Sequence, residues 1–153
     1  MKLAIGADHA GFELKEFLKE CLIREKIDFH DFGAYTLEPE DDYPDFGKKV
    51  AEAVSRGEYE RGILICGTGI GMSITANKFP GVRAALCWDP FTARISREHN
   101  YANILVIGGR TTGKGMAEEI LKEWLKGEFQ EGRHRRRVEK IREIEKENFR
   151  EGQ

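Results

Sequence analysis

The chain has 153 residues, of which 40% are hydrophobic and 34% are charged, and its formal net charge is −2. This length fits one domain with a full core, and the near balance of opposite charges argues against a generic nucleic-acid binder. No stretch approaches the roughly 20 apolar residues of a membrane span, and three cysteines without a CxxC pair indicate a reducing compartment, so we expect a cytoplasmic protein.

Short apolar runs alternate with amphipathic segments along most of the chain. We expect strands at 2–7, 27–32, 63–66, 81–87 and 104–107. Helices are expected at 11–24, after an N-cap at Asp45, at 70–77, at 90–98 after an N-cap at Asp89, and around 116–125. This alternation predicts a three-layer, Rossmann-like α/β fold, with a five-stranded parallel sheet and helices on both faces.

The last segment differs from the rest in composition. Residues 131–150 are mostly charged, and Val138, Ile141, Ile144 and Phe149 form a stripe too narrow for a core of their own. We therefore divide the chain into an α/β domain at 1–130 and a C-terminal dimerisation helix at 131–153 that packs on a partner subunit.

A glycine-rich turn follows the central strand and begins with a cysteine. The order Cys66-Gly67-Thr68-Gly69-Ile70-Gly71 places a thiol at a helix N-terminus, which favours thiolate, beside backbone N–H groups that can receive an anion. The turn reads G-x-G-x-G rather than the dinucleotide G-x-G-x-x-G, and no Walker lysine follows. Met72 stands where a tyrosine-phosphatase loop needs Arg, and Gly69 where a thioredoxin site needs Cys.

Further polar residues are expected near this turn. They are the pairs Asp8-His9 and His99-Asn100, with Thr68 and Arg110. A base beside an oxyanion hole with an Asp and His acid set suits proton transfer next to a carbonyl. Arg133 and Arg137 lie four residues apart on one helical face, which favours joint binding of one phosphate over a nucleic-acid patch.

Six motifs of the chain closely resemble ribose-5-phosphate isomerase type B, whose family includes galactose-6-phosphate and allose-6-phosphate isomerases. In order they are 6–12 (GADHAGF), 42–44 (DYP), 66–71 (CGTGIG), 76–78 (ANK), 97–100 (REHN) and 132–138 (GRHRRRV). The resemblance extends from the first strand to the C-terminal helix. Some members replace the cysteine with a later glutamate; Met72 stands near that position here, so the sequence resembles the cysteine-base subgroup.

The resemblance implies a role for each matching residue. Cys66 would be the general base, with the enediolate oxygen received by an anion hole formed by Gly67, Thr68, Gly69, Ile70 and Gly71. His99 would open the furanose ring with help from Asp8. The remaining contacts would be with the phosphate (His9, Arg133 and Arg137) and with the sugar or phosphate (Asn100 and Arg110). In the family the site lies between two subunits, so a homodimer is expected, with a tetramer left open.

These implications predict an aldose–ketose isomerase of the pentose phosphate pathway that interconverts ribose 5-phosphate and ribulose 5-phosphate. No cofactor is expected, and no metal either, because the histidines are far apart in sequence and no zinc spacing is present. Two alternatives stay open at this point: an isomerase of a six-carbon sugar phosphate, and a non-catalytic sugar-phosphate binding module.

Overall fold

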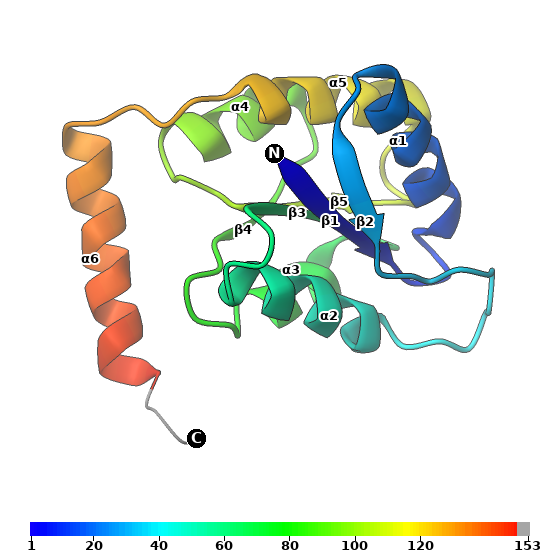
Figure 1. Cartoon of the computed structure of the whole chain (residues 1–153), viewed down its shortest axis with the longest axis horizontal. Coiled ribbons are helices and arrows are strands. Elements are labelled where there is room, and N and C mark those ends of the chain that lie inside the picture. Colours follow the sequence, from blue (N-terminus) through cyan, green and yellow to red (C-terminus); the bar gives the residue numbers. More distant parts are fainter. Residues whose placement is uncertain (150–153) are drawn as a thin grey trace.

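The computed structural model describes residues 1–149, which contain a five-stranded, wholly parallel sheet (Figure 1). The strands are β1 (Lys2–Ala7), β2 (Asp28–Asp31), β3 (Arg61–Cys66), β4 (Ala84–Leu86) and β5 (Ile104–Gly108). Their order across the sheet is β2-β1-β3-β5-β4. The predicted parallel α/β sheet is confirmed, and β3 is its central strand.

Helices cover both faces of this sheet and complete three layers (Figure 1). One face packs against α1 (Phe12–Arg24), α4 (Pro90–Glu98) and α5 (Lys114–Lys126), and the other against α2 (Tyr43–Ser55) and α3 (Ile70–Ala76). The N-cap expected at Asp89 is confirmed, since its side chain accepts a hydrogen bond from the Thr92 N–H at 2.6 Å.

The alternation of side chains along β3 determines which face carries the cysteine. Ile63 and Ile65 are fully buried in the core on the α1 and α5 side, whereas Leu64 and Cys66 are buried in the core on the α2 and α3 side. Cys66 is the last residue of the strand. The thiol therefore lies at the carboxyl end of the sheet, under the helices α2 and α3.

Two elements begin three residues away from their predicted start. Helix α2 begins at Tyr43 with Asp42 in the N-cap position, so the N-cap expected at Asp45 is wrong. Pro44 fits the first helical turn because an N–H at that position has no acceptor within the helix. Strand β4 is shorter than the expected 81–87, because side chains replace the ladder at its start: the N–H of Arg83 donates to Asn103 at 2.7 Å and that of Ala84 to Asn77 at 2.9 Å.

The C-terminal helix α6 (Arg133–Asn148) stands beside β4, apart from the other helices (Figure 1). His134 and Val138 are buried, and the ring of His134 stacks on that of His99 at 4.0 Å, whereas Ile141 and Ile144 stay about half exposed. The helix expected at 131–150 is thus present from Arg133, and the end of the 131–153 segment lies outside the described residues. None of the helices up to Asn148 is long and apolar enough to cross a membrane.

A buried ion pair joins α1 to the end of β2. The Lys15 ammonium is fully buried and donates to both carboxylate oxygens of Asp31, at 2.8 and 2.7 Å, and to the carbonyl of Ala34 at 2.6 Å. Burial alone would raise the pKa of Asp31, but hydrogen bonds from Lys15, Lys19 and the Gly33 N–H hold it below its ordinary value. This pair fixes the turn that leads from β2 toward the carboxyl edge of the sheet.

We predict that Lys15→Met lowers the free energy of unfolding at pH 7 by about 3 kcal/mol, because it leaves a buried carboxylate with one cation fewer. Urea denaturation followed by circular dichroism measures this loss. The stabilisation of Asp31 is present above its ordinary pKa of 3.8 and is lost as pH falls through its lower folded value.

The deficit of Lys15→Met should therefore shrink at pH values below 3.8. Lys19→Met is the matched control and should cost less, because the Lys19 side chain is 23% exposed and remains partly solvated. Equal losses for the two variants, or a deficit that does not change with pH, would contradict this account.

Candidate active site

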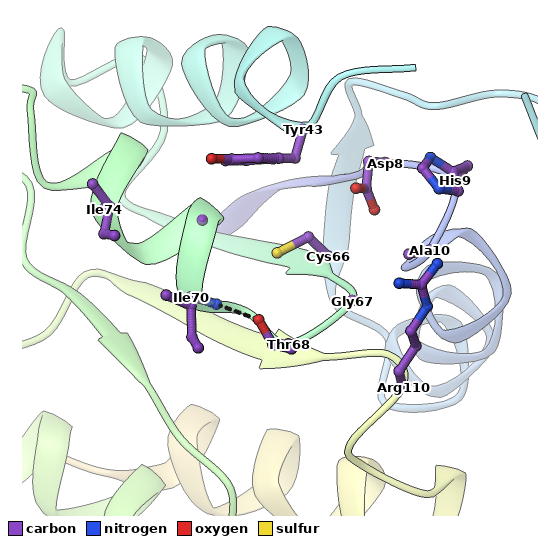
Figure 2. Close-up of a pocket in the computed structure, with 11 residues that line it drawn as sticks. Asp8, His9, Ala10, Tyr43, Cys66, Gly67, Thr68, Ile70, Ile74 and Arg110 are labelled. Atoms are coloured by element: carbon purple, nitrogen blue, oxygen red, sulfur yellow. Dashed lines mark hydrogen bonds between the residues drawn. The ribbon is translucent and has the colours of Figure 1, made fainter. Parts of the chain in front are cut away.

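A cavity of about 430 Å³ opens where β1, β3 and β5 end, and its lining is shown in Figure 2. Eight of the residues singled out in the sequence line it: Asp8, His9, Cys66, Gly67, Thr68, Ile70, Gly71 and Arg110. Ala10, Tyr43 and Ile74 complete the wall. Figure 2 shows the Cys66 sulfur directed into the middle of this group, between Tyr43 and Thr68. The cavity volume falls in the range of small-molecule sites.

The glycines of the turn after β3 are required by close contacts. Gly69 adopts a left-handed conformation, with φ +81°, as the residue before α3. A Cβ on Gly71 would lie 2.3 Å from a ring carbon of Tyr43, so only glycine lets that ring cover the pocket. The Thr68 hydroxyl accepts a hydrogen bond from the Ile70 N–H at 3.2 Å. The turn is thereby held in one shape beside the thiol.

Backbone hydrogen bonds join this turn to the end of β5. The N–H of Gly109 donates to the Cys66 carbonyl at 2.7 Å, and that of Arg110 to the Gly67 carbonyl at 2.8 Å. These bonds direct the carbonyls of Cys66 and Gly67 toward the end of β5. Arg110 is exposed, and one of its guanidinium nitrogens lies 3.3 Å from the position that a Cβ on Gly67 would occupy. An exposed cation is thus placed above the turn.

Asp8 brings a buried carboxyl group to the opposite wall. It is 5% exposed and accepts a hydrogen bond from the Gly11 N–H at 3.1 Å. Burial raises the pKa of Asp8 above its ordinary value; the Gly11 N–H and the imidazole of His9 offset part of this rise, and the Asp41 carboxylate adds to it. Asp8 therefore holds a proton to a higher pH than an exposed aspartate does.

His9 lies next to Asp8 and is held by a residue of the loop between β2 and α2. The carboxylate oxygen Oδ1 of Asp41 lies 3.0 Å from the His9 backbone nitrogen and 2.6 Å from Nδ1 of the ring. Asp8, His9 and Asp41 each bring one possible metal-ligand atom within 4.8 Å of the others. Nδ1 of His9 already bonds to Asp41, and the Asp8 carboxyl accepts from the Gly11 N–H, so these groups have hydrogen-bond partners within the chain.

Two residues that shape the site were not among the candidate site residues: Tyr43, which lines the cavity, and Asp41, which bonds to His9. Tyr43 follows the acidic loop, and its aromatic ring beside Asp42-Pro44 was a usable signal for a pocket wall. Asp41 could not be selected in the same way, because its partner His9 is 32 residues away and four acidic residues occur within the same five positions. Met72 is fully buried in the core between α2, α3 and the sheet, and does not line the cavity.

Five predicted site residues do not line this cavity within the chain: Gly69, which forms the turn before α3, and four residues that lie farther away. His99 ends α4 and stacks on His134, Asn100 lines a different hollow together with Ile141, and Arg133 and Arg137 are exposed on α6. We call His99, His134, Arg133 and Arg137 the α4–α6 basic group. Burial lowers the pKa of His134, and His99, Arg133 and Arg137 lower it further, because these basic groups lie close to its ring.

Comparisons with known proteins agree with this geometry. The chain is 45% identical to the ribose-5-phosphate isomerase B of Escherichia coli, over 94% of this chain and 96% of the relative. Its structure is similar to the ribose-5-phosphate isomerase B of Clostridium thermocellum, with a TM-score of 0.94 and 54% identity over 97% of this chain and 100% of the other.

A third match holds a ligand. The enzyme of Mycoplasma genitalium with bound ribulose-5-phosphate has a TM-score of 0.93 and 39% identity, over 96% of this chain and 97% of that one. The family model described as Ribose/Galactose Isomerase matches residues 3–141, from β1 into α6. The chain therefore belongs to the Ribose/Galactose Isomerase family.

Proposed function

We propose that this protein interconverts ribose 5-phosphate and ribulose 5-phosphate, with Cys66 as the base. The observation that carries the proposal is the placement of the Cys66 sulfur in the cavity, directly before a rigid glycine turn. The relative with bound ribulose-5-phosphate, similar over nearly the whole chain, supports the choice of substrate. The three cysteines are free, which suits a cytoplasmic sugar-phosphate enzyme.

The proton transfer follows from this placement. The Cys66 thiolate takes the C2 proton of the open-chain aldose, and the electron pair of that C–H bond forms a C1–C2 double bond. The aldehyde oxygen then carries the negative charge, which the N–H groups between Gly67 and Gly71 and the Thr68 hydroxyl stabilise. Transfer of the O2 proton to O1 and return of the proton from the Cys66 thiol to C1 then give the ketose and regenerate the thiolate. No change of oxidation state outside the sugar is needed.

Ring opening needs an acid near the furanose oxygen. Asp8 is placed for this role within one subunit, because its raised pKa keeps a proton available at the cavity wall. His99 reaches a cavity only if it belongs to the partner of a dimer, since its own chain holds it against His134. Asn100 is on the same side, so we expect both to act on the site of the partner subunit.

The phosphate requires more positive charge than one subunit places at the cavity. Arg110 and His9 face it, but the carboxylates of Asp8 and Asp41 lie beside them. Among residues 1–149, Arg133 and Arg137 form no ion pair, so they are available to a phosphate on another chain. Exposed Ile70 and Ile74 at the cavity rim and Ile141 and Ile144 on α6 supply apolar surface for such a dimer.

We predict that Cys66→Ser lowers kcat for ribose 5-phosphate by about 100- to 10,000-fold with little change in KM, because it removes a general base and leaves the walls intact. Steady-state kinetics with ribose 5-phosphate and with allose 6-phosphate measure this and decide the sugar length. Cys21→Ser is the matched control, since that thiol is buried on α1, on the other face of the sheet. Near-normal turnover of every sugar phosphate by Cys66→Ser would contradict the assignment.

A shared site predicts complementation between two impaired variants. Cys66→Ser and Arg137→Ala homodimers should both be impaired, the second through a higher KM. In a mixed dimer, one site combines both substituted residues and the other combines the intact Cys66 of one chain with the intact Arg137 of the other. Refolding the two variants together should therefore restore wild-type kinetics at one of the two sites of each mixed dimer.

If each site belonged to one chain, both sites of the mixed dimer would stay defective and no activity would return. A mixture of Arg136→Ala with Cys66→Ser serves as the control. The Arg136→Ala protein keeps both Cys66 and Arg137, so it should be active before mixing. Light scattering on the same samples reports whether a dimer is present.

A further inference from the structure

The contact between His9 and Asp41 joins two segments at the cavity rim. Asp41 belongs to the loop between β2 and α2, and its Oδ1 lies 2.6 Å from Nδ1 of His9 and 3.0 Å from the His9 backbone nitrogen. One carboxylate oxygen therefore receives two N–H groups from a single residue. Such double bonding fixes both the backbone and the ring of His9.

This contact determines which tautomer of His9 is present. An ionised carboxylate only accepts hydrogen bonds, so Nδ1 must carry a hydrogen and donate it to Asp41. The second ring nitrogen, Nε2, forms no hydrogen bond among residues 1–149, while His9 lines the cavity. Nε2 is thus the ring atom available to a ligand.

The burial of Asp41 is unusual for its loop. Its side chain is only 10% exposed, and its second oxygen, Oδ2, is buried without a hydrogen-bond partner within residues 1–149. The neighbouring Glu40 and Asp42 are exposed. Burying a carboxylate costs free energy, because the charged group loses its hydration. An apolar or neutral residue could close the loop without this cost, so loop closure alone does not account for a buried Asp41.

We propose that Asp41 is a positioning residue for His9, holding the ring so that Nε2 faces the phosphate of the substrate. This inference rests on the proposed function, because it needs a sugar phosphate in the cavity. Asp41 does not touch the reacting carbons in this role. It sets the orientation and the tautomer of a side chain that does touch the ligand, much as a carboxylate orients a metal-binding histidine.

Inorganic phosphate, as a competitive inhibitor, tests the positioning role without depending on turnover of a particular sugar. We predict that Asp41→Leu weakens phosphate inhibition and raises KM about tenfold, the effect of losing one charge-assisted hydrogen bond. Asp41→Asn should stay close to wild type, because its amide oxygen can still accept from Nδ1. Glu40→Leu is the matched control: it removes the same charge from the adjacent exposed position.

A double-mutant cycle with His9→Ala separates positioning from loop stability. In the His9→Ala background, Asp41→Leu should have no further effect on phosphate inhibition, because the side chain that it orients is absent. Nitrogen-15 NMR of the neutral imidazole should find the hydrogen on Nδ1 in the wild type and in Asp41→Asn, and a shift toward Nε2 in Asp41→Leu. The melting temperature of each variant reports on folding.

Three results would overturn the proposal: unchanged phosphate inhibition in Asp41→Leu, an equal loss with and without His9, or a wild-type ring that carries its hydrogen on Nε2. If His9→Ala keeps full phosphate affinity, the positioning role fails while a Cys66-dependent isomerase still stands. If Cys66→Ser keeps its turnover, the proposed function fails whatever the state of the His9 ring.

Discussion

The position of Cys66 is determined by the hydrogen bonds of β3 with strands on both sides. The Asp8 N–H donates to the Ile65 carbonyl at 3.3 Å, and the Gly109 N–H donates to the Cys66 carbonyl at 2.7 Å. The three strands therefore end together, and the turns after them form one cavity. Because β3 is buried on both faces, the thiol cannot shift without disturbing the core. Every wall of the site depends on this register.

The sheet, its parallel direction and the central turn were predictable because apolar periodicity and glycine spacing are local signals in the sequence. Details that depend on distant residues were not. Strand β4 is shortened by the side chains of Asn77 and Asn103, and the site loop is held by an Asp41–His9 contact across 32 residues. The position of His99 was equally unpredictable from the sequence, because its stacking on His134 depends on where α6 packs against the rest of the chain.

The distribution of charge is the basis for the proposal that one subunit provides only part of a site. The cavity combines Arg110 and His9 with the carboxyl group of Asp8, and Asp41 lies against His9, while the exposed arginines of the α4–α6 basic group lie elsewhere on the same chain. A phosphorylated sugar needs both sets, one for the reacting carbons and one for the phosphate. Joining them across a dimer would make catalysis depend on assembly, and would give the narrow apolar stripe of α6 a surface to cover.

Proton exchange tests the central claim, that Cys66 removes the proton from C2 of ribose 5-phosphate, most directly. The purified protein is incubated with ribose 5-phosphate in deuterium oxide, and proton NMR follows the C2 proton. We predict that ribulose 5-phosphate appears, that deuterium enters at the carbon that exchanges, and that Cys66→Ser abolishes both changes. A protein that binds the sugar phosphate but leaves its C2 proton in place, with no ribulose formed, would contradict the account and would be a binding module instead.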